Sequence, residues 1–265
     1  MIWIDLRRGR KYRPIIAVTL AAFILFWILG ATGGGNYFLS AMVDKVRKVP
    51  IYSVEQPEKK IAISFDATWG AERTLQILDI LDAHNVKATF FLVNIWLEEY
   101  PQMTREIARR GHEIGMHSVS HPHFSTLSKE EITQELLGNQ NLIEELVGTK
   151  PTLFRPPFGD YNNLSLETAE ELGITTIQWS VDSLDWKDLS AAEIQERVLG
   201  RAGSGDIVLF HNNGLHTAEA LEGILTQFEQ DGLQLVPIGE LLLPADTSYI
   251  DFNGVQRPSN QSQSE

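Results

Sequence analysis

The sequence contains no cysteine, which excludes disulfides and thiolate metal ligands throughout its 265 residues. This fits a protein that works outside a bacterial membrane, where a cysteine-free chain needs no redox control. Basic residues are also scarce: 22 Lys and Arg stand against 35 Asp and Glu, a formal net charge of −13. Binding to nucleic acid requires basic surface that neutralises phosphates, so the composition argues against a nucleic-acid partner.

Only one long hydrophobic run is present, and it covers residues 14–31 near the N-terminus. Its length is close to the ~20 residues that span a bilayer. Five basic residues precede it: Arg7, Arg8, Arg10, Lys11 and Arg13. A basic flank stays on the cytoplasmic side, so we predict a transmembrane anchor within residues 1–32 and an extracytoplasmic remainder. The alternative is a cleaved signal peptide and a secreted protein, because small residues follow the run.

Charge is divided unevenly along the chain. Residues 1–49 hold 8 of the 22 basic and 2 of the 35 acidic residues, which leaves a net charge of −19 for the rest. A domain this acidic is repelled by anionic wall polymers, so any contact with a glycan must depend on a local cleft.

Beyond the anchor, the pattern predicts a linker over 33–57, one domain over 58–246 and a polar, disordered tail over 247–265. Within the domain, apolar runs alternate with amphipathic stretches. The expected strands are 61–65, 88–93, 113–116, 152–154, 175–181, 206–210 and 233–237. The expected helices are 72–83, 103–110, 129–147, 165–172, 191–202 and 218–230. This alternation predicts an α/β fold with parallel strands, open or closed into a barrel.

The most informative motif is the pair His117 and His121, four residues apart in Gly115–His123. Two imidazoles at this spacing can point at one metal ion, and neutral imidazole is a common metal ligand. Other chemical blocks each fall at or just after the C-terminal end of an expected strand, where parallel barrels build their sites. These blocks are Ser64–Gly70, Arg155–Gly159, Asp182–Trp186 and Leu209–His211.

In this order, the five blocks resemble those of the polysaccharide deacetylases of carbohydrate esterase family 4, which carry the NodB-homology domain. The residues of these motifs are most similar to those of the sporulation-type, PdaB-like subgroup. The similarity covers about residues 58–243. The resemblance implies a distorted (β/α)7 barrel. It also implies hydrolysis of N-acetyl groups on an amino sugar, with a divalent metal, for which we expect Zn²⁺.

The resemblance also implies roles for individual residues. Asp66 is the general base, and Arg155 is the permanent charge beside it. His211 is the general acid, oriented by Asp185. His117 and His121 are the metal ligands. The substrate groove is lined by Phe158, near a backbone N–H that binds the oxyanion, and by Trp186.

The chain departs from the family at one position. The first block usually carries two adjacent aspartates, and the second, a metal ligand, is Ala67 here. Three outcomes follow: a weaker site of two imidazoles and water, replacement of the ligand by a side chain such as His123, or an empty site. The sequence therefore predicts a membrane-anchored deacetylase of peptidoglycan amino sugars, acting in sporulation or spore-envelope maturation. The alternatives are a glycan-binding pseudoenzyme and a deacetylase of small amides or proteins.

Overall fold

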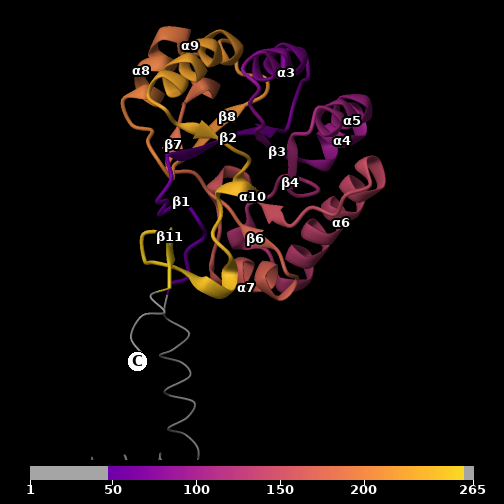
Figure 1. Cartoon of the computed structure of the whole chain (residues 1–265). Coiled ribbons are helices and arrows are strands. Elements are labelled where there is room, and N and C mark those ends of the chain that lie inside the picture. Colours follow the sequence, from indigo (N-terminus) through magenta and orange to yellow (C-terminus); the bar gives the residue numbers. More distant parts are fainter. Residues whose placement is uncertain (1–46, 260–265) are drawn as a thin grey trace, which may run out of the picture. The chain divides into compact units, whose positions relative to one another are not determined.

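The computed structural model describes residues 47–259, and its elements are labelled in Figure 1. The centre is a parallel sheet in the order β6-β5-β4-β3-β2-β8-β7, with β9 paired to β2. These strands are β2 Lys60–Ala67, β3 Thr89–Leu92, β4 Glu113–Met116, β5 Leu153–Phe154, β6 Thr175–Thr176, β7 Val181–Asp182, β8 Ile207–His211 and β9 Gln234–Leu235. Within residues 47–259 the edge strands β6 and β7 are not paired with each other, so the sheet is a half-barrel.

Helices follow most strands and cover the outside of the sheet (Figure 1). They are α3 Thr74–Ala83, α4 Asn94–Glu99, α5 Pro101–Arg109, α6 Lys129–Val147, α7 Asn163–Glu171, α8 Ala191–Leu199, α9 Thr217–Gln230 and α10 Ile238–Leu241. The predicted α/β alternation is confirmed. The start of α6 is fixed by a capping box, in which Ser128 accepts from the Glu131 N–H and the Glu131 side chain accepts from the Ser128 N–H.

The predicted strand over 175–181 is instead two short strands, β6 and β7. Between them the chain leaves the edge of the sheet, and Ile177 forms a parallel bridge with Ile51 from the N-terminal end of the domain. Residues 177–180, which connect β6 to β7, contain no helix and run between the two edge strands of the half-barrel.

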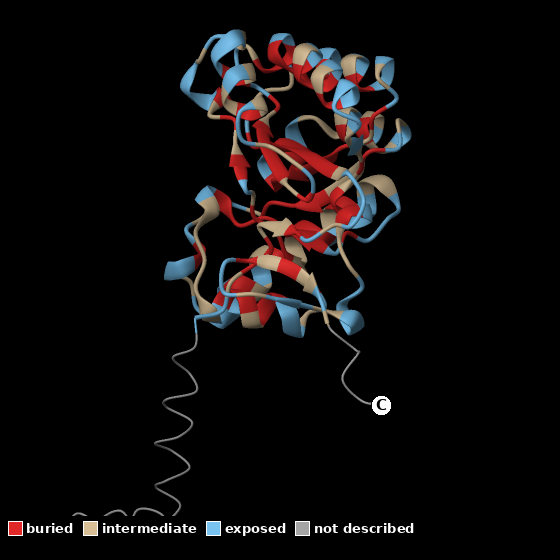
Figure 2. Cartoon of the chain, turned by 60° about the vertical axis from the view of Figure 1, so that its left-hand side comes forward, coloured by how far each residue is buried: buried red, intermediate tan, exposed pale blue. Residues whose placement is uncertain are grey.

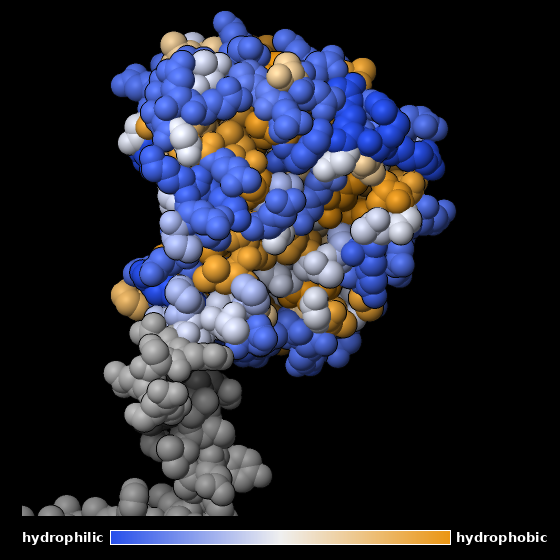
Figure 3. All heavy atoms as spheres, in the orientation of Figure 1, coloured by the Kyte–Doolittle hydropathy of each residue, from blue (hydrophilic) through white to orange (hydrophobic). Residues whose placement is uncertain are grey.

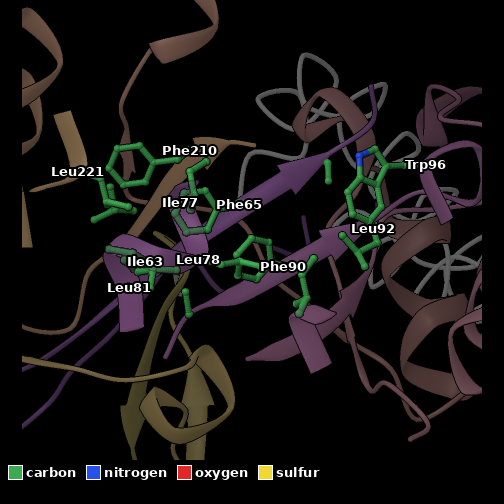
Figure 4. Close-up of a cluster of buried hydrophobic side chains, with 14 of the residues drawn as sticks. Ile63, Phe65, Ile77, Leu78, Leu81, Phe90, Leu92, Trp96, Phe210 and Leu221 are labelled. Atoms are coloured by element: carbon green, nitrogen blue, oxygen red, sulfur yellow. The ribbon is translucent and has the colours of Figure 1, made fainter. Parts of the chain in front are cut away.

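The core lies between the sheet and its helices, and the central strands are buried along their length (Figure 2). Figure 4 shows its central aromatic stack, in which the Phe65 ring lies 4.9 Å from Phe90 and 5.7 Å from Phe210. Outside, the face shown in Figure 3 is mostly hydrophilic, with apolar residues visible in hollows. Because the aromatic stack joins β2, β3 and β8, it fixes the relative positions of the strands that carry Asp66 and His211.

The domain is longer at both ends than the sequence predicted. The compact unit begins at Lys48, and Ile51 and Val54, expected in a linker, are buried. The expected disordered tail contains β10 Ser248–Ile250 and β11 Val255–Pro258, which form a second sheet with β1 Ser53–Val54. Polar composition misled the prediction, because these strands are stabilised by backbone pairing and by the buried amide of Gln256, which contacts Leu243.

We expect a chain ending after residue 246 to be less stable than one ending after residue 259. The shorter chain loses β10 and β11, exposing part of the apolar cluster around Ile51 and Val54. Full exposure of two such side chains corresponds to about 3–6 kcal/mol of unfolding free energy. Urea denaturation of the two chains, both starting at residue 47, measures the difference. Equal midpoints would show that the second sheet contributes nothing to the core.

The predicted anchor over residues 1–32 lies outside the described residues. Within 47–259, no helix has the length and apolar character needed to cross a bilayer.

Candidate active site

Four of the catalytic and metal-binding residues predicted from the sequence lie at the C-terminal edge of the sheet. Asp66 lies near the end of β2, His117 directly follows β4, Arg155 directly follows β5, and His211 ends β8. Asp66 and His211 are register partners on neighbouring strands. Because the strands are parallel, their ends converge at one edge, which is where such sheets hold their sites.

A cavity of about 540 Å³ opens at this edge. Six of the eight predicted site residues line it: Asp66, His117, His121, Phe158, Trp186 and His211. The other two, Arg155 and Asp185, are fully buried behind it. The structure thus brings all eight into one place. It adds cavity residues to which the sequence gave no role, among them Thr68, Trp69, Trp179, Asp188 and Asn213.

Asp66 is a buried carboxylate held by a buried cation. Arg155 Nη1 donates to its Oδ1 at 2.8 Å, while its Oδ2 lies 3.7 Å from His117 Nε2. Burial alone would raise the pKa of Asp66, but the charge of Arg155, followed by those of His117 and His211, outweighs burial and holds the pKa below its ordinary value. Asp66 is therefore ionised at neutral pH, with one oxygen free to face the cavity.

Arg155 is fixed by more than this ion pair. Its Nη2 donates to Ser64 Oγ at 2.9 Å and to the Gln178 carbonyl at 3.2 Å, and the guanidinium lies 4.2 Å from the Phe91 ring centre. Ser64, which the sequence did not single out, belongs to this buried hydrogen-bond network. Its only signal is a polar residue within the apolar run of β2, two positions before Asp66, so that both side chains lie on one face of the strand.

His117 and His121 are both in the neutral form that can ligate a metal. The Nδ1–H of His117 donates to the Arg155 carbonyl at 2.7 Å, because a carbonyl can only accept, and this leaves Nε2 with a free lone pair. Burial lowers the pKa of His117, and burial together with His117 lowers the pKa of His121 to about 4. His121 has a left-handed backbone (φ 57°), and its ring centre lies 5.0 Å from that of His117.

The third ligand of the family's metal site has no substitute here. Ala67 is fully buried in the apolar core. His123, the suggested replacement, stacks on Phe158 with ring centres 4.5 Å apart, its Nδ1 lies 3.5 Å from Asp160 Oδ2, and it does not line the cavity. Across residues 47–259, no group of three or more His, Asp or Glu side chains has the arrangement of a metal site. The residues fit a metal held by two imidazoles, and they do not fit a three-ligand site.

His211 and Asp185 form the second charge pair of the cavity. His211 Nδ1 lies 2.8 Å from Asp185 Oδ1, and its backbone N–H donates to Oδ2 at 2.8 Å. Thr217 Oγ1, which the sequence reasoning missed, also donates to Oδ2, at 2.6 Å. Burial alone would lower the pKa of His211, but the hydrogen bond and charge of Asp185 outweigh it and raise the pKa above its ordinary value. His211 can therefore carry a proton at neutral pH.

Aromatic side chains form the cavity walls. Phe158 and Trp186, both predicted, are more than half exposed, and so is Trp69. The Phe158 ring lies 4.5 Å from His121, and the Trp69 ring lies 5.6 Å from His121 on another side. Exposed rings beside polar groups suit the apolar faces of a sugar. The signal for Trp69 was its place in the loop that directly follows the strand carrying Asp66.

This geometry agrees with comparisons to known proteins. A model of the polysaccharide deacetylase family matches residues 53–177. A peptidoglycan-N-acetylglucosamine deacetylase of Bacillus cereus is 36% identical, over 72% of this chain and 92% of that protein. The protein YlxY of Bacillus subtilis is 35% identical over 77% of this chain, which spans only 63% of YlxY.

Among solved structures, a pseudoenzyme of carbohydrate esterase family 4 from Bacillus anthracis is similar, with 34% identity and a TM-score of 0.71. The match covers 73% of this chain and 68% of that one. A mutant of that pseudoenzyme with restored enzymatic activity matches with the same TM-score. The chain belongs to the polysaccharide deacetylase family, carbohydrate esterase family 4.

Proposed function

We propose that this protein is a membrane-anchored, extracytoplasmic deacetylase that hydrolyses the N-acetyl groups of peptidoglycan amino sugars. One observation carries the proposal: two separate charge pairs, Asp66 with Arg155 and His211 with Asp185, face one aromatic-walled cavity from neighbouring strands. A site that only binds glycan has no need of an ionised carboxylate and a proton-carrying imidazole side by side. Hydrolysis of an amide needs both.

The two pairs divide the reaction between them. Asp66 takes a proton from a water molecule while the oxygen of that water attacks the acetamide carbonyl carbon. Arg155 keeps Asp66 oriented and ionised. The developing oxyanion lies near the Phe158 wall. His211 then gives its proton to the sugar nitrogen as the carbon–nitrogen bond breaks, leaving acetate and a free amine. Asp185 supplies the negative charge that stabilises protonated His211 before this step.

A metal would be held by His117 and His121, with water completing its shell. When bound, a divalent ion such as Zn²⁺ would polarise the acetamide carbonyl and acidify a bound water. With Ala67 in place of a carboxylate, we propose that binding is weaker than in family members that carry the second aspartate.

Location and cellular role are part of the same proposal. The basic flank and the apolar run over 14–31 support a single-pass anchor with the domain outside the cytoplasm. Resemblance to the sporulation-type, PdaB-like subgroup supports a role in sporulation or spore-envelope maturation, and this part rests on analogy with the family alone.

A second candidate function is a glycan-binding pseudoenzyme. Ala67 and the lack of a three-ligand site within residues 47–259 favour it, as does the likeness to the Bacillus anthracis pseudoenzyme. The retained pairs of Asp66 and His211 favour the enzyme.

Acetate release decides between these functions. The chain from residue 47 onward is incubated with peptidoglycan, chitin oligomers and small acetylated amines, with and without Zn²⁺. We expect release from a glycan, increased by Zn²⁺. No release from any substrate together with retained glycan binding would establish the pseudoenzyme, and release from small amines alone would reject a glycan substrate.

We expect Asp185→Asn to shift the fall in activity on the alkaline side to lower pH. Without the carboxylate, burial dominates and the pKa of His211 drops, so the proton is lost at lower pH. Loss of an effective general acid corresponds to roughly 10²-fold in kcat/KM at neutral pH. The measurement is kcat/KM against pH, with exposed Asp231→Asn as the matched control. An unchanged alkaline limb would mean that His211 is not the acid.

A further inference from the structure

The hairpin of β10 and β11, residues 248–258, presents apolar side chains outside the cavity. Phe252 is 86% exposed, the highest value for a large hydrophobic residue in the described part of the chain, while Tyr249 and Ile250 are 52% and 42% exposed. Other strongly exposed aromatics, such as Trp69, Phe158 and Trp186, line the cavity and are explained by it. The hairpin group has no role in the active site.

The turn that carries Phe252 is held in one shape. Asp251 Oδ1 accepts from the N–H groups of Asn253 and Val255, and Asp251 Oδ2 accepts from Arg257 Nε at 2.8 Å. Gly254 has φ 82°, and a Cβ there would collide with Tyr52. The backbone thus fixes an apolar ring in the solvent, which is unfavourable unless another surface covers the ring.

Charge on the hairpin differs from that of the domain. Between residues 248 and 258 the only charged side chains are Asp251 and Arg257; they pair with each other, and Arg257 also pairs with Glu55 beside the hairpin. Residues 50–265 together carry a net charge of −19. A neutral, aromatic-tipped hairpin on an acidic domain suits an apolar partner rather than a charged polymer. Tyr, with an apolar ring and a polar hydroxyl, suits the boundary between water and lipid, and Phe and Ile suit its apolar side.

The hairpin also lies where the chain enters the domain. The Tyr52 N–H donates to the Gly254 carbonyl at 2.8 Å, and β1 pairs with β11 in parallel register. Only 15 residues, 32–46, separate the end of the apolar run from Arg47. Even fully extended, 15 residues reach at most about 50 Å. The N-terminal run, once in a bilayer, therefore limits the distance of Arg47, where the chain enters the domain, to at most about 50 Å from the membrane, within reach of the neighbouring hairpin.

We infer that the β10–β11 hairpin docks on the surface of the bilayer that holds the N-terminal run, with Phe252, Tyr249 and Ile250 entering the lipid boundary. This contact orients the domain on the membrane, in addition to the covalent tether. The inference rests on the anchor of the proposed function and is independent of whether the cavity is catalytic.

The absence of cysteine allows a direct test on the full chain. Asn253→Cys, beside Phe252, and Thr226→Cys, exposed on α9 at the end of the domain remote from β11 (Figure 1), each receive one environment-sensitive fluorophore. The chains are reconstituted in phosphatidylcholine vesicles with and without a lipid-borne quencher. We expect a blue-shifted emission that lipid quenches at position 253, and an aqueous emission at 226. Phe252→Ser should return position 253 to the aqueous signal, whereas Leu75→Ser, an exposed apolar site on α3, should not.

Three results would overturn the inference. In one, position 253 stays aqueous although the chain floats with the vesicles. In another, the fluorophore at position 253 is shielded from water to the same extent when an amphipathic polymer without lipid keeps the chain in solution. That result would identify a second copy of the chain as the occupant. In the third, the chain does not associate with vesicles at all, so the anchor fails as well. Acetate release from the same samples reports the catalytic proposal separately, because Phe252 lies outside the cavity lining.

Discussion

Asp66→Asn should lower kcat/KM for acetate release by about 10²–10⁴-fold, the range for loss of a general base. Asparagine keeps the shape of the side chain and an oxygen that can accept from Arg155, but it cannot take a proton from water. The substitution also leaves a buried guanidinium without its carboxylate, so we expect a loss of about 3–5 kcal/mol in unfolding free energy. Circular dichroism and a denaturation curve separate the two effects.

The pH dependence sharpens this test. Because Arg155 holds the pKa of Asp66 below its ordinary value, the fall in the parent's activity on the acid side should lie at lower pH than protonation of an ordinary aspartate would give. Asp231→Asn, an exposed change of the same chemistry on the surface beside α9, should alter neither rate nor profile. Release by folded Asp66→Asn at the parental rate would assign the base elsewhere.

Ala67→Asp should destabilise the metal-free protein strongly and make its stability depend on metal. Ala67 has no exposed surface and belongs to the apolar core, so a carboxylate there is a buried charge without a partner. Such a charge costs about 3–5 kcal/mol. If His117 and His121 share a metal with this position, Zn²⁺ pairs with the carboxylate and restores stability as bound ligand does by mass action. Tighter metal binding should also raise the rate.

The measurement is the melting temperature of parent and variant across a Zn²⁺ titration, with acetate release on the same samples. Ala67→Asn is the matched control, since it has the same size but no charge and is a poorer ligand for Zn²⁺. Zn²⁺ should raise the melting temperature of Ala67→Asp far more than that of Ala67→Asn or the parent. Equal Zn²⁺ responses in all three would place residue 67 outside any shared metal site.

Much of the fold could be predicted from local pattern. The bounds of α6 followed from the capping box at Ser128 and the glycine at 148, and β4 from a short apolar run after Gly111. Both signals are local: a side chain satisfies backbone groups three residues away, or a turn ends the element. The second sheet was missed because β1 and β11 lie about 200 residues apart, and their pairing depends on backbone register rather than on composition.

The amino-acid sequence alone was enough to predict the family and to nominate the candidate site residues, because short motifs at the strand ends can be recognised from residue order without the fold. It also determined that Ala67 cannot ligate a metal, since alanine has no donor atom. Tertiary structure decided which groups touch. It buried Arg155 between Asp66 and Ser64, set Thr217 on Asp185, and turned His123 away toward Phe158 and Asp160. These contacts join segments that the chain separates by tens of residues, and only the packing of parallel strands brings them within hydrogen-bond distance.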